Sequence, residues 1–410
     1  MSAISPEIDP SDVGLDPARL ALVGRRFDRY VAERKLPGFL VVVTRAGKVA
    51  HVAHGGFRDL ENGVPVEADT LFRIYSMTKP ITSVAAMICY EEGLLALDDP
   101  LSKFIPEFAE TRVFAGGSSF RPATAPMSEP IRIWHLMTHT SGLTYGWMYN
   151  HPVDAMYRSA GFDWDPPPDL DLAECCSRLA GLPLRCQPGT EWNYSVATDV
   201  LGRVVEIASG QRFEQFLTER VLGPLGMKET SFCVEGEGAE RLAVLYSPDL
   251  VSGRATRAVH MGEVALHPPR APLGGSGLVS TAADYHRFTQ MLLRRGELDG
   301  VRILGARTVP YMTRNHLPEG AELAQFGNPI GEESEAGVGF GLGFSVVIDP
   351  AALKVTSSVG EYGWGGAAST LFWVDPEEEL TVLFFTQLLP SSTYPIRRQL
   401  KQLVYSAIVG

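Results

Sequence analysis

A hydroxyl and an amine stand three residues apart in the stretch Leu71-Phe-Arg-Ile-Tyr-Ser-Met-Thr-Lys-Pro-Ile81, at Ser76 and Lys79. The stretch begins with β-favouring residues, and Pro80 suits the first turn of a helix because its missing N–H loses no hydrogen bond there. We therefore predict a strand-to-helix turn at Ser76. Residues three apart on a helix lie on one face, about 5–6 Å from each other, so Lys79 is placed to act on Ser76.

The pair has a chemical and a structural interpretation. A serine hydroxyl becomes a good nucleophile when a base removes its proton, and a lysine can be that base when burial or a nearby cation lowers its pKa. The apolar neighbours of Lys79 favour burial, and the start of a helix favours an oxyanion at Ser76. Alternatively, Ser76 is a helix cap and Lys79 a surface residue. Because chance supplies such a pair about once in a chain of this size, other segments must decide.

Composition narrows the class of protein. The chain has 410 residues, 45% of them hydrophobic, which is ample for a globular protein with a large core. Its net charge of −12 argues against nucleic acid and against an anionic membrane surface as partners. We find no secretory signal and no apolar run near the roughly 18 residues of a membrane span, so we expect a cytoplasmic protein. The five cysteines have no regular spacing and indicate neither a disulfide framework nor a zinc site.

Strand patterns lie at both ends of the chain, with helical patterns between them. Asp16 and Pro17 predict a helix start, Thr281 predicts another, and Ile396, Leu400 and Val404 mark a terminal helix. Strands are predicted at residues 39–44, 48–53, 341–349, 354–361, 368–374 and 380–387. We therefore predict a discontinuous α/β domain of residues 1–75 and 275–410, interrupted by a mostly helical domain of residues 76–274. Ser76 would lie at their junction, where clefts commonly form.

A second candidate group is Tyr194, in the segment Pro188-Gly-Thr-Glu-Trp-Asn-Tyr-Ser195. The turn-forming start of this segment places Tyr194 on a loop that enters the next helix, which is a common position for a cleft residue. A phenol near Lys79 could relay the Ser76 proton, because the charge of the lysine would favour the phenolate. The alternative is a core tyrosine with a satisfied hydroxyl.

A third candidate element is Tyr362-Gly-Trp-Gly-Gly-Ala367. Glycines such as Gly365 and Gly366 within a strand pattern indicate a bulge or a close approach to the backbone. A backbone N–H from this segment and that of Ser76 could together hold a substrate carbonyl in an oxyanion hole. An ordinary glycine-containing turn is the alternative.

Together the three elements resemble those of the penicillin-recognising serine hydrolases, which comprise class C β-lactamases, penicillin-binding proteins and esterase relatives. The chain is most similar to the family VIII carboxylesterases, and the resemblance extends to His135-Leu-Met-Thr-His-Thr-Ser-Gly-Leu143 and Gly275-Ser-Gly-Leu-Val-Ser-Thr281. It covers residues 15–405. It implies an α+β, β-lactamase/transpeptidase-like fold, in which helices flank an antiparallel sheet and a mostly helical domain is inserted.

The resemblance also implies roles for individual residues. Ser76 would be the nucleophile, Lys79 its base or proton partner, and Tyr194 the second proton-transfer group. The backbone N–H groups of Ser76 and Ala367 would form the oxyanion hole. The reaction would then proceed through an acyl-enzyme that is formed and hydrolysed, without a metal or a cofactor.

Two departures from the class C pattern indicate the substrate. Class C β-lactamases are similar to one another in having an asparagine two residues after the tyrosine and a lysine at the start of the third motif. This chain has Val196 and Trp364 there. An indole cannot make the charge-assisted bond of a lysine and leaves an apolar wall. We therefore expect a small-molecule substrate, a neutral short to medium acyl carboxylic ester. The alternatives are an acyltransferase of the lovastatin-synthesis type, a β-lactamase with esterase side activity, and a catalytically silent binding protein, and the oligomeric state stays open.

Other candidate substrate contacts are aromatic. The loop with Tyr145, Trp147 and Tyr149 would line or cover the cleft beside Trp364, Gly365, Gly366 and Val196, or would simply pack on its own rings. His135 and His139 have a spacing that can bind metal, but no glutamate general base stands beside them, so we expect a role in the fold. The Gly-x-Ser-x-Gly elbow of α/β-hydrolases is absent.

Overall fold

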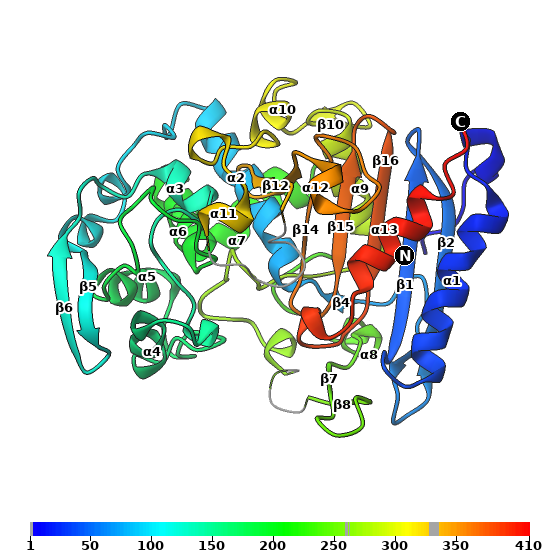
Figure 1. The fold of residues 1–410 in the computed structure, drawn as a ribbon, viewed down its shortest axis with the longest axis horizontal. Coiled ribbons are helices and arrows are strands. Elements are labelled where there is room, and N and C mark those ends of the chain that lie inside the picture. Colours follow the sequence, from blue (N-terminus) through cyan, green and yellow to red (C-terminus); the bar gives the residue numbers. More distant parts are fainter. Residues whose placement is uncertain (1–2, 259–260, 262, 328–335) are drawn as a thin grey trace.

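An eight-stranded sheet forms one side of the molecule in the computed structural model, which describes residues 3–258, 261, 263–327 and 336–410. The order is β12-β13-β14-β15-β16-β1-β2-β3, and every neighbouring pair is antiparallel. The strands are β1 (Gly38–Arg45), β2 (Lys48–Asp59), β3 (Val64–Pro65), β12 (Val338–Phe340), β13 (Ser345–Val347), β14 (Tyr362–Gly365), β15 (Leu371–Asp375) and β16 (Leu380–Phe385). Both chain ends thus contribute to one sheet (Figure 1), and the α+β fold class is confirmed.

Each face of the sheet is buried under helices. Along β1, Val41 and Val43 pack into the core beneath α1 (Pro17–Ala32) and α13 (Ile396–Tyr405). Leu40 and Val42 point the other way, into the larger core that contains α2 (Thr78–Glu91) and α9 (Ala282–Leu293). Successive side chains of a strand point to opposite faces. A strand that is covered on both faces therefore consists of consecutive apolar residues.

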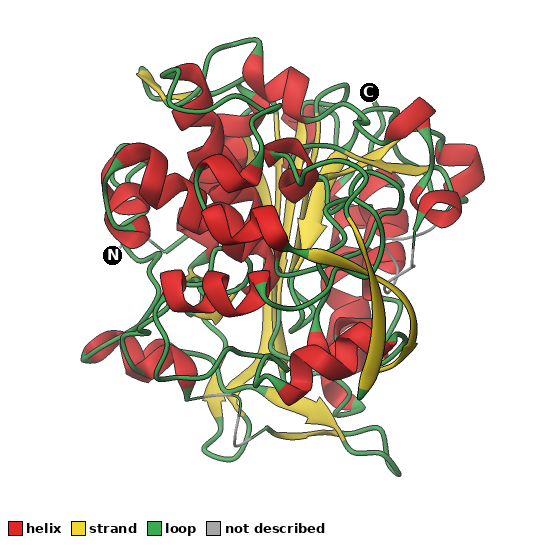
Figure 2. Cartoon of the chain, turned by 90° about the vertical axis from the view of Figure 1, so that its left-hand side faces the viewer, coloured by secondary structure: helices red, strands yellow, loops and turns green. Residues whose placement is uncertain are grey.

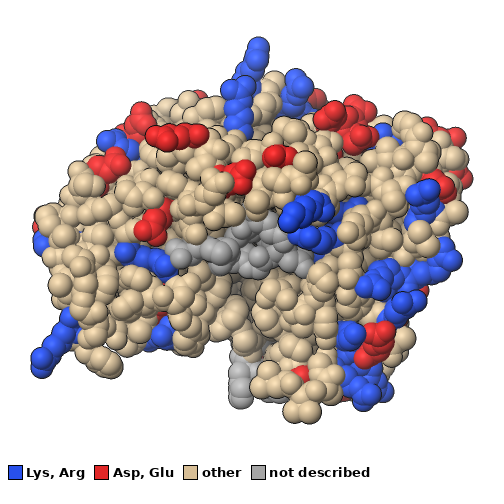
Figure 3. All heavy atoms as spheres, viewed as in Figure 1, with Lys and Arg blue, Asp and Glu red and all other residues tan. Residues whose placement is uncertain are grey.

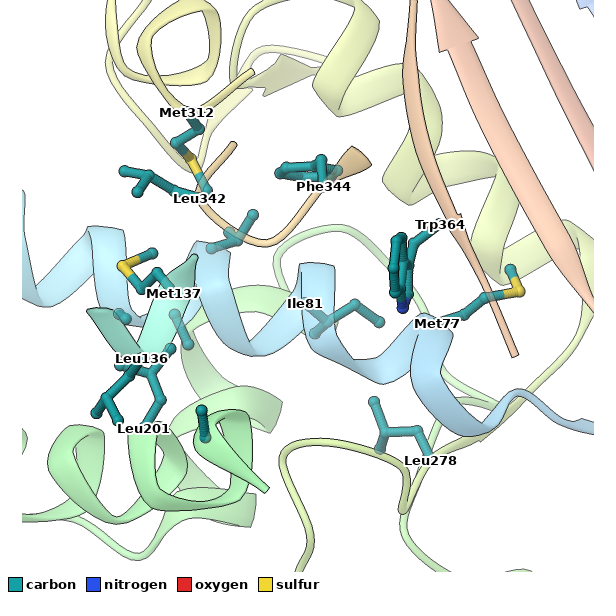
Figure 4. Close-up of a cluster of buried hydrophobic side chains, with 14 of the residues drawn as sticks. Met77, Ile81, Leu136, Met137, Leu201, Leu278, Met312, Leu342, Phe344 and Trp364 are labelled. Carbon is teal, nitrogen blue, oxygen red and sulfur yellow. The ribbon is translucent and has the colours of Figure 1, made fainter. Parts of the chain in front are cut away.

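Helix α2 runs through the centre of the larger core. Every residue from Thr78 to Cys89 is buried. Figure 4 shows Ile81 of α2 and Met77, which directly precedes the helix, close to Trp364, with Leu136 and Leu201 near a later part of the helix. This packing places Lys79 in an apolar interior, where the side chain is 1% exposed.

The segment between the two sheet portions is mainly helical and also contains a β-hairpin. Among its helices are α3 (Ile133–Met137), α4 (Pro152–Ser159), α5 (Leu172–Ala180), α6 (Ala197–Ser209) and α7 (Phe213–Leu217). The hairpin consists of β5 (Arg112–Ser118) and β6 (Arg121–Pro126), which curve along this side of the molecule (Figure 2). The division of the chain into domains stays a prediction.

Shorter elements complete the described fold. They are β4 (Phe72–Arg73), β7 (Tyr246–Pro248), β8 (Ala255–Arg257), β9 (Val279–Ser280), β10 (Glu297–Leu298), β11 (Val301–Arg302), α8 (Glu237–Arg241), α10 (Thr308–Met312), α11 (Leu323–Phe326) and α12 (Pro350–Leu353). Within the described residues, none of the helices has the length and apolar character needed to cross a membrane. Figure 3 shows acidic and basic side chains dispersed over one face, so the negative net charge does not form a single patch there.

Two of the predicted strands differ from the structure. Of residues 341–349, only 345–347 are a strand, β13, and residues 341–344 form the tight turn that follows β12, in which Gly343 has a φ of 95° that favours glycine. Residues 354–361 form no strand: Lys354 and Gly360 have left-handed φ values of 60° and 89°, which interrupt extended backbone after α12. Residues 362–365, expected to follow a strand, are themselves β14.

A buried acidic group ties β14 to α13. Glu361 is 2% exposed, its carboxylate pairs with Lys401, and it accepts a hydrogen bond of 2.5 Å from the Tyr405 hydroxyl. Burial raises the pKa of Glu361, and Lys401 lowers it. A group whose pKa is raised by folding stabilises the protein below its unfolded pKa, and this contribution is lost as the pH rises through the folded pKa.

We expect Lys401→Met to destabilise the protein more at pH 8 than at pH 5. Without the cation, the pKa of Glu361 rises further, so more of the carboxyl is neutral at pH 5, whereas its ionisation at pH 8 leaves an uncompensated buried charge. Breaking a buried pair costs about 3 kcal/mol. Thermal melts at both pH values measure the difference, with the exposed Lys354→Met as the matched control. Equal losses at both pH values would contradict the expectation.

Candidate active site

Ser76 lies in a tight turn between β4 and α2. The turn is a 3-10 helix, Tyr75–Met77, and Tyr75 has a φ of 44°, a left-handed conformation that costs a non-glycine residue energy. Neighbouring backbone holds the turn: Ile74 N donates to Leu278 O at 3.1 Å. Ser76 lines a cavity of about 350 Å³ and is partly exposed, whereas the residues around it are mostly buried. The hydroxyl is therefore both fixed and accessible.

The Lys79 amine has three oxygen neighbours. Nζ lies 3.3 Å from Ser76 Oγ, 3.0 Å from the Tyr145 hydroxyl and 2.8 Å from the carbonyl oxygen of Gly275. An ammonium could donate one N–H to each of the three oxygens. A neutral amine could instead donate to Gly275 and Tyr145 and accept the Ser76 proton. Both protonation states thus fit the same geometry, and the predicted pairing of Ser76 with Lys79 is present.

Tyr194 lies over the same amine. Lys79 Nζ is 4.5 Å from the centre of the Tyr194 ring, and the ring is buried. The indole Nε1 of Trp364 donates a hydrogen bond of 3.2 Å to the Tyr194 hydroxyl oxygen. The structure thus brings Tyr194 to the Ser76–Lys79 pair and gives its oxygen a fixed N–H partner.

The loop that carries Tyr194 is held in place by contacts with residues 138–144. Asn193 N donates to His139 O at 2.8 Å, and Asn193 Nδ2 donates to Leu143 O at 2.7 Å. The His139 imidazole contacts Ser195 Oγ at 3.3 Å and the Tyr194 ring at 4.8 Å between centres. His135 Nδ1 accepts the Arg132 N–H at 3.0 Å. Both histidines therefore have local structural contacts.

The two residues of the predicted oxyanion hole lie at the same cavity. Ser76 and Ala367 both line it. Gly366 permits the close approach of their segments, because a Cβ there would lie 2.4 Å from Ile74 O. The role of their backbone N–H groups as an oxyanion hole stays a prediction.

Comparison with known proteins identifies relatives of this chain. The family profile described as Beta-lactamase matches residues 23–406. The chain belongs to the Beta-lactamase family. It is 39% identical over 360 residues to Protein Rv1367c of Mycobacterium tuberculosis, covering 87% of this chain and 86% of that protein. It is 34% identical to Esterase EstB of Burkholderia gladioli, covering 97% and 98% of the two chains.

A solved structure also resembles this Beta-lactamase family protein over almost its whole length. EstCE1, described as a hydrolase with promiscuous acyltransferase activity, superposes with a TM-score of 0.79 at 27% identity, covering 97% of this chain and 99% of that one. The predicted resemblance is therefore confirmed at the level of the family and the fold. Serine hydrolysis and acyl transfer are the chemistry that these relatives support.

The predicted substrate contacts of this family member lie in four different places. Tyr145 and Trp147 line the main cavity, as predicted. Val196 borders a smaller neighbouring cavity of about 30 Å³. Tyr149 lies outside the main cavity, with its ring 67% exposed and the Arg158 guanidinium over one face. Trp364, Gly365 and Gly366 are buried and outside the described lining of the main cavity, so the apolar wall expected from Trp364 is not part of it.

The main cavity has a wall that the sequence indicated only in part. The rings of Tyr145 and Trp147 stack at 5.0 Å between centres, and Trp147 stacks on Trp164 at 5.3 Å and 15°. This three-ring wall runs from the Lys79 contact of Tyr145 to the partly exposed Trp164. The lining also includes Phe232 and Leu273. Clustered aromatics at residues 145–164 were the sequence signal.

Two contacts near Lys79 had no sequence signal. The Gly275 carbonyl holds the amine, and the carboxylate of Asp199 accepts the Gly275 N–H at 2.7 Å. Neither residue type nor local spacing points to such a contact, because it joins segments far apart in the chain.

Proposed function

We propose that this protein is a carboxylesterase that cleaves short to medium acyl esters through an acyl-enzyme on Ser76. The observation that carries the proposal is the buried Lys79 amine, 3.3 Å from the hydroxyl of an accessible serine in a cavity. The similarity to an esterase over nearly the whole chain supports it.

The proposed reaction has two halves. In the first, Ser76 Oγ attacks the ester carbonyl while its proton moves to the Lys79–Tyr194 pair, and the N–H groups of Ser76 and Ala367 receive the oxyanion. Collapse of the tetrahedral intermediate breaks the ester bond, and the alcohol leaves with the proton. In the second half, water attacks the acyl-enzyme, the pair takes its proton, and the carboxylic acid leaves as Ser76 is reprotonated.

The cavity favours a neutral small-molecule ester. Its stacked aromatic rings, together with Phe232 and Leu273, offer apolar surface to an acyl chain or an alcohol. Trp364 stands where class C β-lactamases have a lysine, and its N–H points to Tyr194. The site therefore lacks that lysine's charge for a β-lactam carboxylate. We propose neither nucleic acid nor a membrane as a partner.

Labelling of Ser76 tests the proposal directly. A fluorophosphonate should add once to the folded protein, at Ser76, as measured by intact mass and peptide mapping. Hydrolysis of p-nitrophenyl butyrate should fall in proportion to the fraction of protein that is labelled. An unlabelled Ser76 in an inactive but folded sample would support the silent binding protein instead. Turnover of a chromogenic cephalosporin as fast as that of the ester would favour the β-lactamase.

Acyl transfer to an alcohol is the second candidate, favoured by the printed description of EstCE1 as a hydrolase with promiscuous acyltransferase activity. The same acyl-enzyme would then be attacked by an alcohol in place of water. Adding a primary alcohol to the ester assay and measuring the ratio of new ester to free acid distinguishes the two. A ratio that greatly exceeds the molar ratio of alcohol to water would make transfer the main activity.

The two tyrosines at Lys79 should differ in importance. Tyr194→Phe removes the proposed proton-transfer hydroxyl, so we expect kcat to fall on the order of 10²-fold or more. Tyr145→Phe removes one hydrogen bond to Nζ but keeps the ring stack, so we expect a loss of about tenfold. Steady-state kinetics of both variants on p-nitrophenyl butyrate measure the difference. A larger loss for Tyr145→Phe would assign the proton transfer to Tyr145.

A further inference from the structure

Asp199 is a buried carboxyl behind the Lys79 amine. It lies in the first turn of α6, five residues after Tyr194, and is 8% exposed. Its Oδ1 accepts the N–H of Gly275 at 2.7 Å, and the carbonyl of Gly275 accepts from Lys79 Nζ at 2.8 Å. A single glycine therefore links a carboxylate to the amine that contacts Ser76.

Gly275 fits closely between its two polar neighbours. A Cβ at this position would lie 2.9 Å from Asp199 Oδ1 and 3.2 Å from the Tyr145 hydroxyl. A carbon and an oxygen atom only 2.9 Å apart would overlap, so a side chain at residue 275 would push the carboxylate away. The absence of a side chain at residue 275 is thus a condition for the link from Asp199 to Lys79.

The charge of Asp199 is coupled to that of Lys79. Burial raises the pKa of Asp199 to about 6, and the Lys79 ammonium opposes that rise. This attraction is mutual, so an ionised Asp199 favours the protonated form of Lys79. The titratable groups that face Asp199 are Lys79 of α2, Tyr145, Asp165, and Cys175 and Cys176 of α5.

We propose that Asp199 is a positioning residue of the hydrolysis: through Gly275 it holds the Lys79 amine beside Ser76, and its negative charge stabilises the ammonium that Lys79 carries in the transition state. The carboxylate of a serine protease triad acts in the same way on its imidazolium. Asp199 contacts no reacting atom and transfers no proton. The inference rests on the proposed function of Ser76 and Lys79.

The pH profile of Asp199→Asn tests the inference. Asparagine keeps the volume and an Oδ1 acceptor for Gly275, and it removes only the charge. For wild type we expect kcat on p-nitrophenyl butyrate to fall as the pH drops through about 6, because Asp199 becomes protonated. For the variant we expect kcat at pH 8 to be at least about tenfold lower, KM to stay within about twofold, and the inflection near pH 6 to disappear.

Two further variants separate charge from geometry. Gly275→Ala keeps the carboxylate but displaces it, so we expect a lower kcat with the inflection retained. Asp284→Asn is the matched control, because Asp284 is a similarly buried carboxyl in the first turn of α9 whose partners are Thr230 and Glu229. We expect wild-type kinetics from this control.

Three outcomes would overturn the inference. One is an Asp199→Asn enzyme with wild-type kcat and inflection. Another is a kcat lowered equally at every pH with the inflection unmoved, which would mean a structural role only. The third outcome applies if Asp199→Asn does not fold, as judged by circular dichroism. In that case a wild-type kcat in Gly275→Ala would overturn the inference. Failure of the proposed function is distinct, since wild type itself would then show no hydrolysis and no labelling of Ser76.

Discussion

Ser76→Ala is expected to lower kcat on p-nitrophenyl butyrate by about 10³-fold or more, because alanine has no oxygen to form the acyl-enzyme. The cavity, the backbone N–H groups and the aromatic wall remain, so KM should change little. Fluorophosphonate labelling should disappear with the activity. Steady-state kinetics and intact mass on the same preparation measure both effects.

The matched control for this variant is Ser83→Ala. Ser83 lies on the same helix, one turn beyond Lys79, and is 1% exposed. It is a buried serine that faces Gly343 and is not part of the cavity lining. We expect wild-type activity and labelling from this control. Retained turnover in Ser76→Ala, with the control unchanged, would exclude Ser76 as the nucleophile.

Lys79→Met is expected to have the second largest effect, a loss in kcat on the order of 10²–10⁴-fold. Methionine has a similar length and no charge, so it should fill the same buried space without a cavity. The Ser76 proton would then lose its nearest acceptor, and the Gly275 carbonyl would lose its donor. The rate of fluorophosphonate labelling should fall with kcat, because the same activated hydroxyl performs both reactions.

Lys103→Met is the control for the removal of a lysine. Its amine pairs with Asp99 on the surface and is 51% exposed, so its loss should leave kinetics unchanged. An Lys79→Met enzyme that keeps more than a tenth of wild-type kcat and its labelling rate would assign proton transfer to Tyr194 alone. Loss of labelling in a Lys79→Met enzyme that keeps the wild-type melting curve would support proton transfer by Lys79 and Tyr194 together.

The sequence predicted the start of a helix correctly where the capping side chain is adjacent to that helix in the chain. The Asp16 carboxylate caps α1 and Thr281 caps α9, as their sequence positions indicated. The strand expected at residues 354–361 is absent, and the left-handed φ values of Lys354 and Gly360 interrupt the extended backbone there. Residues 112–126 also pair as β5 and β6 despite a composition typical of loops, because cross-strand hydrogen bonds decide a hairpin.

The candidate site could be predicted as a set of segments but not as a set of contacts. Ser76, Lys79 and Tyr194 carry recognisable motifs, and the structure brings them together. The hydrogen bond from Trp364 to Tyr194 and that from Gly275 to Asp199 join separate segments, and no spacing rule indicates them. Side-chain direction and depth of burial, which decide such contacts, emerge only from the packed fold.

The pairing of β1 with β16 has a consequence for biosynthesis. Leu40 lies opposite Phe385, so the sheet cannot close until nearly the whole chain has left the ribosome. Strand β14, which precedes Ala367, joins the same sheet just as late. The nascent chain therefore carries Ser76 for most of its synthesis without the opposite wall, and pairing between such distant segments is slow to form. Enzymatic activity should consequently appear only after β16 has been synthesised and has paired with β1.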